Sequence, residues 1–328
     1  MTVPPRIVSL LPSATEIVVA LGLGEQLVGR SHECDYPAWV ARLPVCTSTI
    51  LAKGLSSIEI DNRVQAIVSR GLSVYEVDSE LLRALRPDII LTQSQCAVCA
   101  VTPRDLKDAL GNWVGIAPEL ISLAPDRLAD IWGDMTRVGE ATGVCARAEN
   151  LVERLQGRLE ALAGRRAASR PRPTIAAIEW TEPLMAAGNW VPELIEIAGG
   201  RALFMAPGQH SAWLDWSALV DQDPALIVMM PCGYRISQTL AELPAIAARA
   251  DWQNLAAVRA GRVFVADGHH FFNRPGPRLV ESAEIIAAIV DAEDWETGSL
   301  DRGWLRLPAP PAAAIRRTDA LAGSPRRW

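Results

Sequence analysis

Short apolar runs alternate with amphipathic stretches along the first part of the chain. Runs of the size of buried or half-buried strands occur at 6–10, 27–31, 72–77, 88–93 and 118–123. Between them lie helix-start signals: Ser13 and Glu16 stand at capping-box spacing after Pro12, and Asp78 precedes a short helical pattern. The pattern predicts an α/β lobe in which strands and helices alternate.

One long amphipathic pattern then interrupts the alternation. Leu151, Leu155, Leu159 and Leu162 form one stripe within residues 144–166, which predicts a single long helix. Afterwards the alternation restarts, with strands predicted at 174–180, 225–230 and 262–267 and helices at 190–200, 215–222, 237–250 and 278–292. The predicted organisation is an N-terminal lobe at 1–143, a linking helix at 144–168, a C-terminal lobe at 169–295 and an irregular tail at 296–328.

The two predicted lobes also resemble each other in sequence. TEIVVALGLG in the first lobe aligns with PELIEIAGGR in the second, and RPDIILTQ aligns with DPALIVMM. A duplicated lobe explains both matches, although short helix ends of this type also match by chance. Two similar lobes that face each other form a cleft, so the fold class predicted is α/β with a ligand cleft between two lobes.

Composition and charge narrow the class of protein. The net charge of -6 is spread without a run of one sign, which excludes the basic footprint of a nucleic-acid binder. No stretch approaches the roughly 18 apolar residues of a membrane span. The opening MTVPPRIVSLLPSATE lacks the apolar core of a signal peptide. We therefore expect a cytoplasmic protein, or a periplasmic or surface one if the start codon is misassigned.

Several of these segments together resemble a known family. The opening RIVSLLPSATEIVVALGLGEQLVG, the strand RPDIIL, the long linking helix, the AGG after a second-lobe helix and the strand DPALIV are similar to the iron-siderophore and vitamin B12 binding proteins of ABC importers. Within this helical-backbone periplasmic-binding class, the cobalamin-binding type is the nearest in pattern. The resemblance covers about residues 5–292.

The resemblance implies a small-molecule ligand, cobalamin or another corrinoid or chelated metal, held flat between the lobes with little hinge closure. It implies ligand contacts from loops at the carboxyl ends of strands and from aromatic walls, where ring stacking contributes about 0.5–1.5 kcal/mol per pair. The candidate ligand-binding residues are Ser13, Thr15, His32, Glu33, Asp35, Tyr36, Gln93, Trp180, Trp190, His210, Trp213, Trp216, Tyr234, His269, His270, Phe271 and Arg274. For each tryptophan alone, a place in the core is at least as good an interpretation.

The resemblance also implies docking to an ABC permease through one acidic residue on each lobe. Counting back from the proline before each buried strand gives Glu80 in the first lobe but Ser217 in the second. The second position lacks the expected carboxylate, so the sequence leaves a permease partner open. We expect a monomer.

The cysteines present a separate possibility. His32 or Cys34 in the stretch SHECDYP, together with Cys96 and Cys99 in SQCAVCA, would form an imidazole and thiolate set suited to zinc or a soft metal if the two loops meet. Alternatively, Cys96 and Cys99 are small apolar residues under the loop, or a redox dithiol. The sequence leaves these three interpretations open.

No sequence motif indicates catalysis. The chain has no G-x-S-x-G, H-E-x-x-H or phosphate-binding loop, and its Gly22 and Gly24 end a helix instead of opening one. We therefore predict a non-catalytic binding protein for cobalamin or a related ligand. The alternative is a cytoplasmic metal-binding or thiol-dependent protein on the same fold, without a transporter partner.

Overall fold

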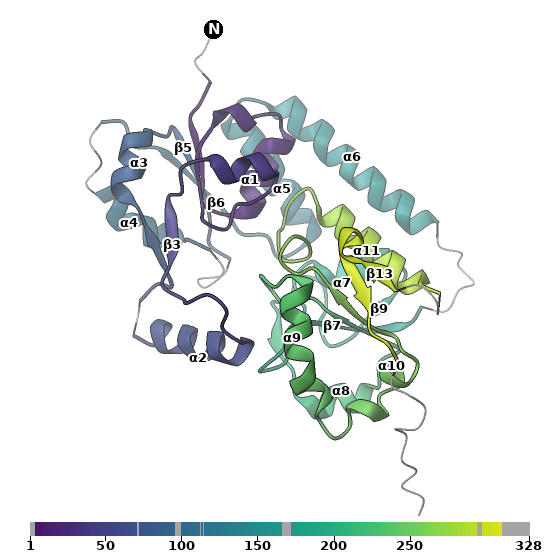
Figure 1. The fold of residues 1–328 in the computed structure, drawn as a ribbon. Coiled ribbons are helices and arrows are strands. Elements are labelled where there is room, and N and C mark those ends of the chain that lie inside the picture. Colours follow the sequence, from purple (N-terminus) through teal and green to yellow (C-terminus); the bar gives the residue numbers. More distant parts are fainter. Residues whose placement is uncertain are drawn as a thin grey trace, which may run out of the picture.

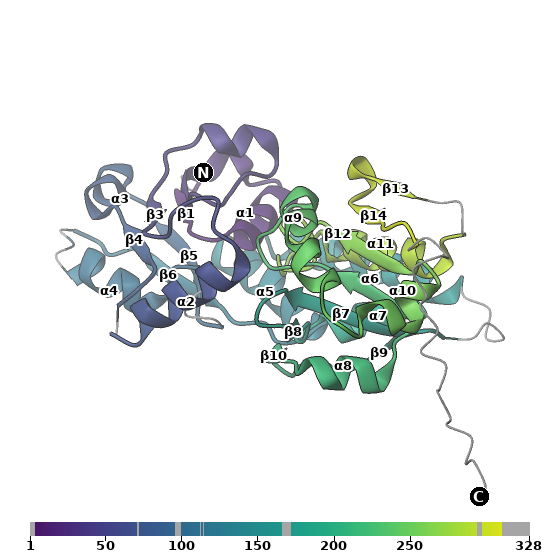
Figure 2. The same cartoon turned by 60° about the horizontal axis from the view of Figure 1, so that its bottom comes forward.

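A computed structural model describes residues 4–70, 72–95, 100–111, 113, 115–165, 172–293 and 297–309. The chain forms two α/β lobes joined by one long helix, as the alternation of patterns predicted (Figure 1). Figure 2 shows the two lobes side by side. Within the described residues, no helix is both long and apolar enough to cross a membrane.

The first lobe is built on a parallel sheet with strand order β2-β1-β5-β6. These strands are β1 (Ile7–Ser9), β2 (Leu27–Arg30), β5 (Ile89–Gln93) and β6 (Glu119–Leu123). The helices of this lobe are α1 (Pro12–Ala20), α2 (Ser57–Val68), α3 (Ser79–Leu85), α4 (Pro103–Gly111) and α5 (Leu128–Ala141), with short 3-10 turns η1 (Gly24–Gln26) and η2 (Ala38–Arg42). The strand predicted at 72–77 does not join this sheet, because β4 (Tyr75–Val77) pairs only with β3 (Thr47–Thr49) in a separate antiparallel ladder.

The first helix begins differently from the prediction. Its N-cap is Leu11 with no side-chain cap, so Ser13 and Glu16 do not form the expected capping box. Pro12 starts the helix, where its missing N–H is tolerated. Glu16, 4 % exposed, is thereby free to serve a different purpose, described below.

The linking helix is α6 (Cys145–Gly164), and its apolar stripe is buried as predicted. Leu151, Leu155, Leu159 and Leu162 face inward together with Ala148. The helix packs against α5 of the first lobe and against α7 (Val191–Ile197) and α11 (Leu279–Asp291) of the second. In Figure 1 it runs diagonally from one lobe to the other. The buried apolar side chains of both lobes form one contact cluster through this helix, so the lobes share a core.

The second lobe is built on a mixed sheet with strand order β10-β8-β7-β11-β12-β14-β13, and β9 beside β7. The strands are β7 (Thr174–Trp180), β8 (Met185–Ala186), β9 (Arg201–Ala202), β10 (Ala212–Trp213), β11 (Leu226–Met229), β12 (Val263–Ala266), β13 (Gly298–Ser299) and β14 (Trp304–Arg306). The remaining helices are α8 (Trp216–Gln222), α9 (Ile236–Ala247) and α10 (Ala256–Arg259), with turns η3 (Trp252–Asn254) and η4 (Leu300–Arg302).

Part of the segment predicted as an irregular tail belongs to this sheet. β14 pairs antiparallel with β12, and Trp304 is 2 % exposed against Phe264, with ring centroids 5.7 Å apart. A strand of three residues is too short to show an alternating pattern, and its place depends on the distant β12. The sequence pattern could therefore not reveal it. Residues 310–328 lie outside the described part of the chain.

Candidate interlobe binding site

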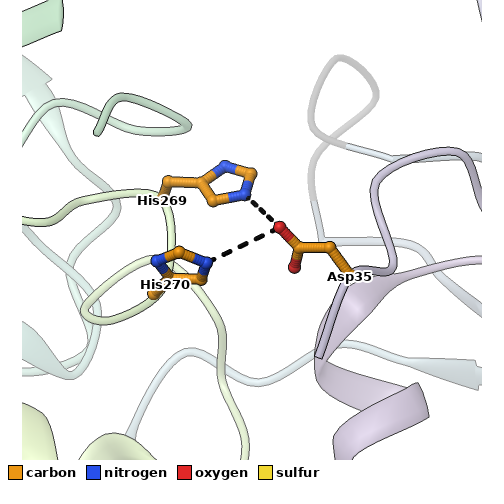
Figure 3. A group of neighbouring side chains, drawn as sticks. All are labelled: Asp35, His269 and His270. Carbon is orange, nitrogen blue, oxygen red and sulfur yellow. Dashed lines mark hydrogen bonds and ion pairs between the residues drawn. The ribbon is translucent and has the colours of Figure 1, made fainter. Parts of the chain in front are cut away.

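Two loops, each at the carboxyl end of a strand, meet where the lobes face each other. One follows β2 in the first lobe and carries Asp35; the other follows β12 in the second lobe and carries His269, His270 and Arg274. Nε2 of His269 lies 2.7 Å from Oδ2 of Asp35, and Nε2 of His270 lies 3.6 Å from the same oxygen (Figure 3). The two loops therefore touch directly across the lobe boundary.

The second-lobe loop is held rigid by its own side chains. Oδ1 of Asp267 accepts hydrogen bonds from the backbone N–H groups of His269 (3.0 Å) and His270 (2.8 Å). Oδ2 of Asp267 bonds Nδ1 of His270 at 2.9 Å. A Cβ atom on Gly268 would overlap the carbonyl oxygen of Pro231, so only glycine fits there. The loop can therefore hold its two imidazole rings in defined positions.

Buried ion pairs join the same loop to the first helix. Nη1 of Arg274 donates to Oε1 of Glu16 at 3.2 Å and to Oδ1 of Asp35 at 2.8 Å. Arg278 donates to both carboxylate oxygens of Glu16, at 2.8 and 2.6 Å, and its guanidinium lies 3.8 Å from the centre of the Tyr36 ring. Arg274 is 6 % exposed and Glu16 4 %, so charged groups of opposite sign compensate each other in a site largely removed from water.

These pairs shift the ionisation of the acid at the centre. Burial alone would raise the pKa of Asp35, but hydrogen bonds from His269 and His270 and the charge of Arg274 lower that pKa far below its ordinary value. The carboxylate of Asp35 is therefore charged at neutral pH.

Two further contacts cross the boundary, and both bring a second-lobe glutamate to the start of a first-lobe helix. Glu242 of α9 accepts from the N–H of Ser57 (3.1 Å) and from its hydroxyl (2.7 Å) at the start of α2. Glu193 of α7 accepts from the N–H of Leu128 at 2.9 Å at the start of α5. Carboxylates at these positions satisfy N–H groups that have no partner within the helix.

A second group of residues includes carboxyl groups from both lobes that act on the thiol of Cys232. Burial raises the pKa of Glu33 to about 7, and burial likewise raises the pKa of Glu179 to about 7. After burial, the charges of these two carboxyl groups raise the pKa of the Cys232 thiol further, so an acid from each lobe acts on the same thiol. Within the second lobe, the rings of Trp180 and Tyr234 contact each other in a tilted arrangement, with centroids 5.3 Å apart. The Tyr234 hydroxyl donates to the carbonyl of Leu55 in the first lobe at 3.5 Å.

The candidate residues from the sequence thus fall into two sets. The structure brings Asp35, Tyr36, His269, His270, Phe271 and Arg274 together in the loop contact, with Glu33, Trp180 and Tyr234 in the neighbouring group. The other candidates contact their own lobe. Among these, Trp190 is 5 % exposed and its indole N–H donates to the carbonyl of Phe272 at 2.6 Å, so the ring lies in the core.

The remaining candidates have local partners. The Thr15 hydroxyl bonds Ser9 (2.8 Å), Ser13 is 3 % exposed, and Gln93 donates to the carbonyl of Ala100 at 3.0 Å. In the second lobe, His210 lies 3.4 Å from Asn189 and Trp216 packs against Trp252 with ring centroids 6.3 Å apart. Trp213 differs, because its side chain is 59 % exposed.

Of the four residues in the predicted histidine and cysteine metal site, the structure describes two, His32 and Cys34. Nδ1 of His32 lies 2.8 Å from the Thr47 hydroxyl, and Sγ of Cys34 accepts from Thr15 at 3.0 Å. Burial raises the pKa of the Cys34 thiol to about 12. Cys96 and Cys99 lie outside the described residues, so a site made by these four residues stays a prediction.

Sequence reasoning did not assign Glu16, Arg235, Asp267 or Arg278 to the site. Arg278 closes the same stretch as the histidines, DGHHFFNRPGPR, and Asp267 opens it. A charge at each end of a stiff loop was a signal that could have been used. Glu16 had no such signal, since its capping-box spacing favoured a local partner.

Comparison with known proteins places this geometry in context. The model of a family described as periplasmic binding protein matches residues 7–269. An uncharacterized ABC transporter substrate-binding lipoprotein of Bacillus subtilis is 25 % identical over 290 residues, covering 87 % of this chain and 79 % of that protein. The vitamin B12-binding protein of Yersinia pestis is 25 % identical over 262 residues, covering 77 % of this chain and 81 % of that protein.

A solved structure shows the same fold. The periplasmic heme binding protein of Pseudomonas aeruginosa superposes with a TM-score of 0.63 at 24 % identity, covering 89 % of this chain and 95 % of that one. The two-lobed arrangement with a linking helix is therefore shared, whereas similarity at this level says nothing about the ligand.

The expectation of a cytoplasmic location is wrong. The matching family is one of periplasmic binding proteins, and the Bacillus relative is a lipoprotein. The expectation rested on the opening residues of the sequence, which carry no information about any segment outside it. The matched family and the lipoprotein relative contradict the expectation.

Proposed function

Because the chain belongs to the periplasmic binding protein family, we propose that it binds cobalamin or a related corrinoid between its two lobes as the substrate-binding component of an ABC importer. Two of its relatives support the two halves of this proposal. One is a vitamin B12-binding protein and the other an ABC transporter substrate-binding lipoprotein.

The observation that carries the proposal is the collection of rings at the lobe boundary. Tyr36, 44 % exposed, lies in the first-lobe loop next to Asp35, and the two imidazoles of His269 and His270 approach Asp35 from the second lobe. A corrin is a flat chelate of cobalt bearing amide side chains. Aromatic faces suit the flat ring, while imidazole nitrogens suit either the amides or an axial position on the metal.

The neighbouring group extends this surface within the second lobe. The hydroxyl of Ser211 donates to Glu179 at 2.7 Å, which places the following β10 beside the Cys232 group. Trp213 of β10 is exposed and offers a large flat face to a ligand there. Trp180 and Tyr234 of the same lobe contribute two further rings, which contact each other with centroids 5.3 Å apart.

We propose that the protein itself does no chemistry on its ligand. Burial raises the pKa of the Cys34 thiol to about 12, and burial raises the pKa of the Cys232 thiol as well. Nucleophilic catalysis needs the thiolate, whose pKa would have to be lowered instead. Binding alone accounts for the arrangement of these residues.

Docking to a permease is proposed through the first lobe. Glu80 is exposed in the first turn of α3, where its carboxylate is accessible to an arginine of a partner. Its counterpart position in the second lobe, Ser217 at the start of α8, is also exposed but carries no charge. Docking of the second lobe to a permease would therefore use contacts other than an ion pair at this position.

Calorimetric titration with cobalamin, cobinamide and haem tests the ligand. We expect one corrinoid per chain, bound more tightly than haem. Trp213→Ala and Trp180→Ala should each weaken corrinoid binding about tenfold, the effect of losing roughly 1.4 kcal/mol. The control is Trp113→Ala, which removes an indole packed within the first lobe.

Absence of heat and of any spectral change with either corrinoid would refute the proposal. Tight binding of haem alone would keep the importer function and replace the ligand. Equal loss of affinity in the Trp113 variant would show that the aromatic rings act through stability, which thermal melting of each variant measures independently.

A further inference from the structure

We infer that Asp35, His269 and His270 form a binding site for a divalent first-row transition metal ion that joins the two lobes. The site is distinct from the histidine and cysteine set considered from the sequence. It goes beyond the proposed corrinoid function, because it needs no organic ligand and is tested without one.

The donor atoms converge on one point. Oδ2 of Asp35, Nε2 of His269 and Nε2 of His270 all lie within 4.8 Å of one another (Figure 3). The oxygen is 2.7 Å from one nitrogen and 3.6 Å from the other. Ligand atoms of a tetrahedral zinc ion stand about 3.3 Å apart, as metal–ligand bonds of about 2.0–2.1 Å require. Each of the two oxygen–nitrogen distances is therefore within about 0.6 Å of metal-binding geometry, and the two imidazole nitrogens lie within 4.8 Å of each other.

The types of donor also fit. Two imidazoles and one carboxylate suit zinc and its neighbours in the first transition series, whereas calcium and magnesium prefer oxygen ligands alone. Three protein ligands leave a fourth position for water or for a group on a bound molecule.

The ring of His270 is already oriented as in a metal site. Its Nδ1 bonds Oδ2 of Asp267 at 2.9 Å, which leaves Nε2 directed toward Asp35. A carboxylate on the far nitrogen fixes the tautomer and makes the near nitrogen a better ligand. Asp267 also holds the backbone of both histidines, so the same side chain positions the loop and the ring.

Metal binding by Nε2 of His269 would replace the hydrogen bond that this nitrogen makes to Asp35. That nitrogen lies 2.7 Å from Oδ2 of Asp35 and 3.1 Å from Nη2 of Arg274. With a proton this nitrogen donates to the carboxylate; without one its lone pair can accept from arginine or bind a metal ion. A cation bound between the nitrogen and the oxygen uses both lone pairs at once.

The arginines near the site can accommodate the ion. Arg274 and Arg278 share Glu16 as partner, and Arg274 also holds the other oxygen of Asp35, so their charges are matched. Arg235 contacts the metal-facing oxygen at 3.3 Å, but its side chain is 53 % exposed. An exposed pair of this kind contributes little and is readily displaced.

Because its ligands come from both lobes, the ion would tie the lobes together. Asp35 lies in the first lobe and the histidines lie in the second, with more than two hundred residues between them. A ligand that binds only this arrangement stabilises it by mass action.

Titration of the protein with Zn²⁺ and Co²⁺ tests the inference. The full chain, made without a histidine tag and stripped with a chelator, is titrated in competition with a chromophoric chelator and without any corrinoid. We expect one ion per chain and, for Co²⁺, the visible absorption of nitrogen and oxygen coordination. His269→Ala, His270→Ala and Asp35→Asn should lower the affinity at least a hundredfold, and Asp267→Asn about 10- to 100-fold.

The chain supplies a matched control, since it has only four histidines. His210→Ala changes an exposed histidine near Asn189, away from the three ligands, and should leave metal affinity unchanged. The inference is overturned if no ion binds, or if His269→Ala and His270→Ala keep the parent affinity. Circular dichroism identifies any variant that fails to fold. If a ligand variant does not fold, the metal affinity of Asp267→Asn, a milder change, is the test: the inference requires that this affinity falls, and an unchanged affinity overturns it.

Corrinoid titration of the metal-stripped protein separates this inference from the proposed function. Metal binding without corrinoid binding would support the ion site and refute the corrinoid. Corrinoid binding by a chain that binds no metal would support the proposed function and overturn the inferred ion site.

Discussion

Asp134 shows how burial sets the charge of a single side chain. Its side chain is 4 % exposed within α5, and Nη1 of Arg137 is 3.4 Å from Oδ1. Oδ2 has no hydrogen-bond partner among the described residues. Burial raises the pKa of this carboxyl to about 6 against a partly opposing charge from Arg137. The folded protein therefore binds a proton at Asp134 more readily than the unfolded chain does.

This shift makes the free energy of unfolding depend on pH. A raised pKa in the folded state contributes stability that is full below pH 3.8 and is lost as the pH rises through about 6. A pKa difference of about two between the folded and unfolded states corresponds to at most about 3 kcal/mol in the free energy of unfolding. Asp134→Asn should thus be more stable than the parent at pH 8 by about 1–3 kcal/mol, with the difference gone near pH 4.

Urea unfolding of both proteins at pH 4 and pH 8 measures this difference. Glu140→Gln, an exposed change on the same helix, should show no such pH-dependent difference. A constant difference between Asp134→Asn and the parent at both pH values would mean that the carboxyl is not protonated preferentially in the fold.

At the scale of elements, the contact between α5 and α6 positions the two lobes. A Cβ atom on Gly139 of α5 would overlap the methyl group of Ala148 of α6, whereas one on Gly133 of the same helix would meet nothing within 4 Å. The first glycine permits two helices to approach closely. Gly133 has no such packing role and lowers the stability of its helix relative to alanine.

The two glycines therefore predict opposite effects of the same substitution. Gly139→Ala should destabilise the protein by about 1–3 kcal/mol, because the two helices must move apart. Gly133→Ala should stabilise it by about 0.5–1 kcal/mol, because alanine loses less backbone entropy in a helix. Thermal or urea unfolding measures both. Equal changes in the two variants would contradict the close approach of α5 to α6.

At the scale of the whole molecule, buried charges and a shared core join the lobes. Arg274 is the main charged link, with Glu16 and Asp35 as partners from the first lobe. Arg158 of α6 makes a comparable number of ion pairs with Glu281 and Glu284, but its side chain is 40 % exposed. The two arginines differ chiefly in their access to water.

Removal of each charge should reflect that difference. Arg274→Met should destabilise the protein by about 1–3 kcal/mol, because the buried carboxylate of Glu16 would lose one of its two arginine partners and the partly buried Asp35 would lose one as well. Arg158→Met should cost at most about 1 kcal/mol, since exposed pairs contribute little. Urea unfolding gives the two values, and small-angle scattering reports whether the lobes separate in the first variant. Similar values for both would mean that water reaches the Arg274 site.

Much of this fold could be predicted from the sequence because its signals are local. The leucine stripe of α6 buries the residues that its spacing predicted, and β1, β5, β7, β11 and β12 lie within the predicted apolar runs. The histidines and Asp35 were also candidates, since they follow predicted strands. The three-residue β14 and the role of Glu16 could not be predicted, because each depends on a partner far away in the chain.

By itself, the sequence determined two α/β lobes, the helix that links them and a set of polar and aromatic residues at strand ends. These follow from periodicity and from turn-forming residues, which act over a few positions. Only the tertiary structure decided that Asp35 meets His269 and His270, that Glu16 pairs with Arg274, and that Trp190 lies in the core while Trp213 is exposed. Contacts between lobes depend on how two folded surfaces fit together, which no local pattern encodes.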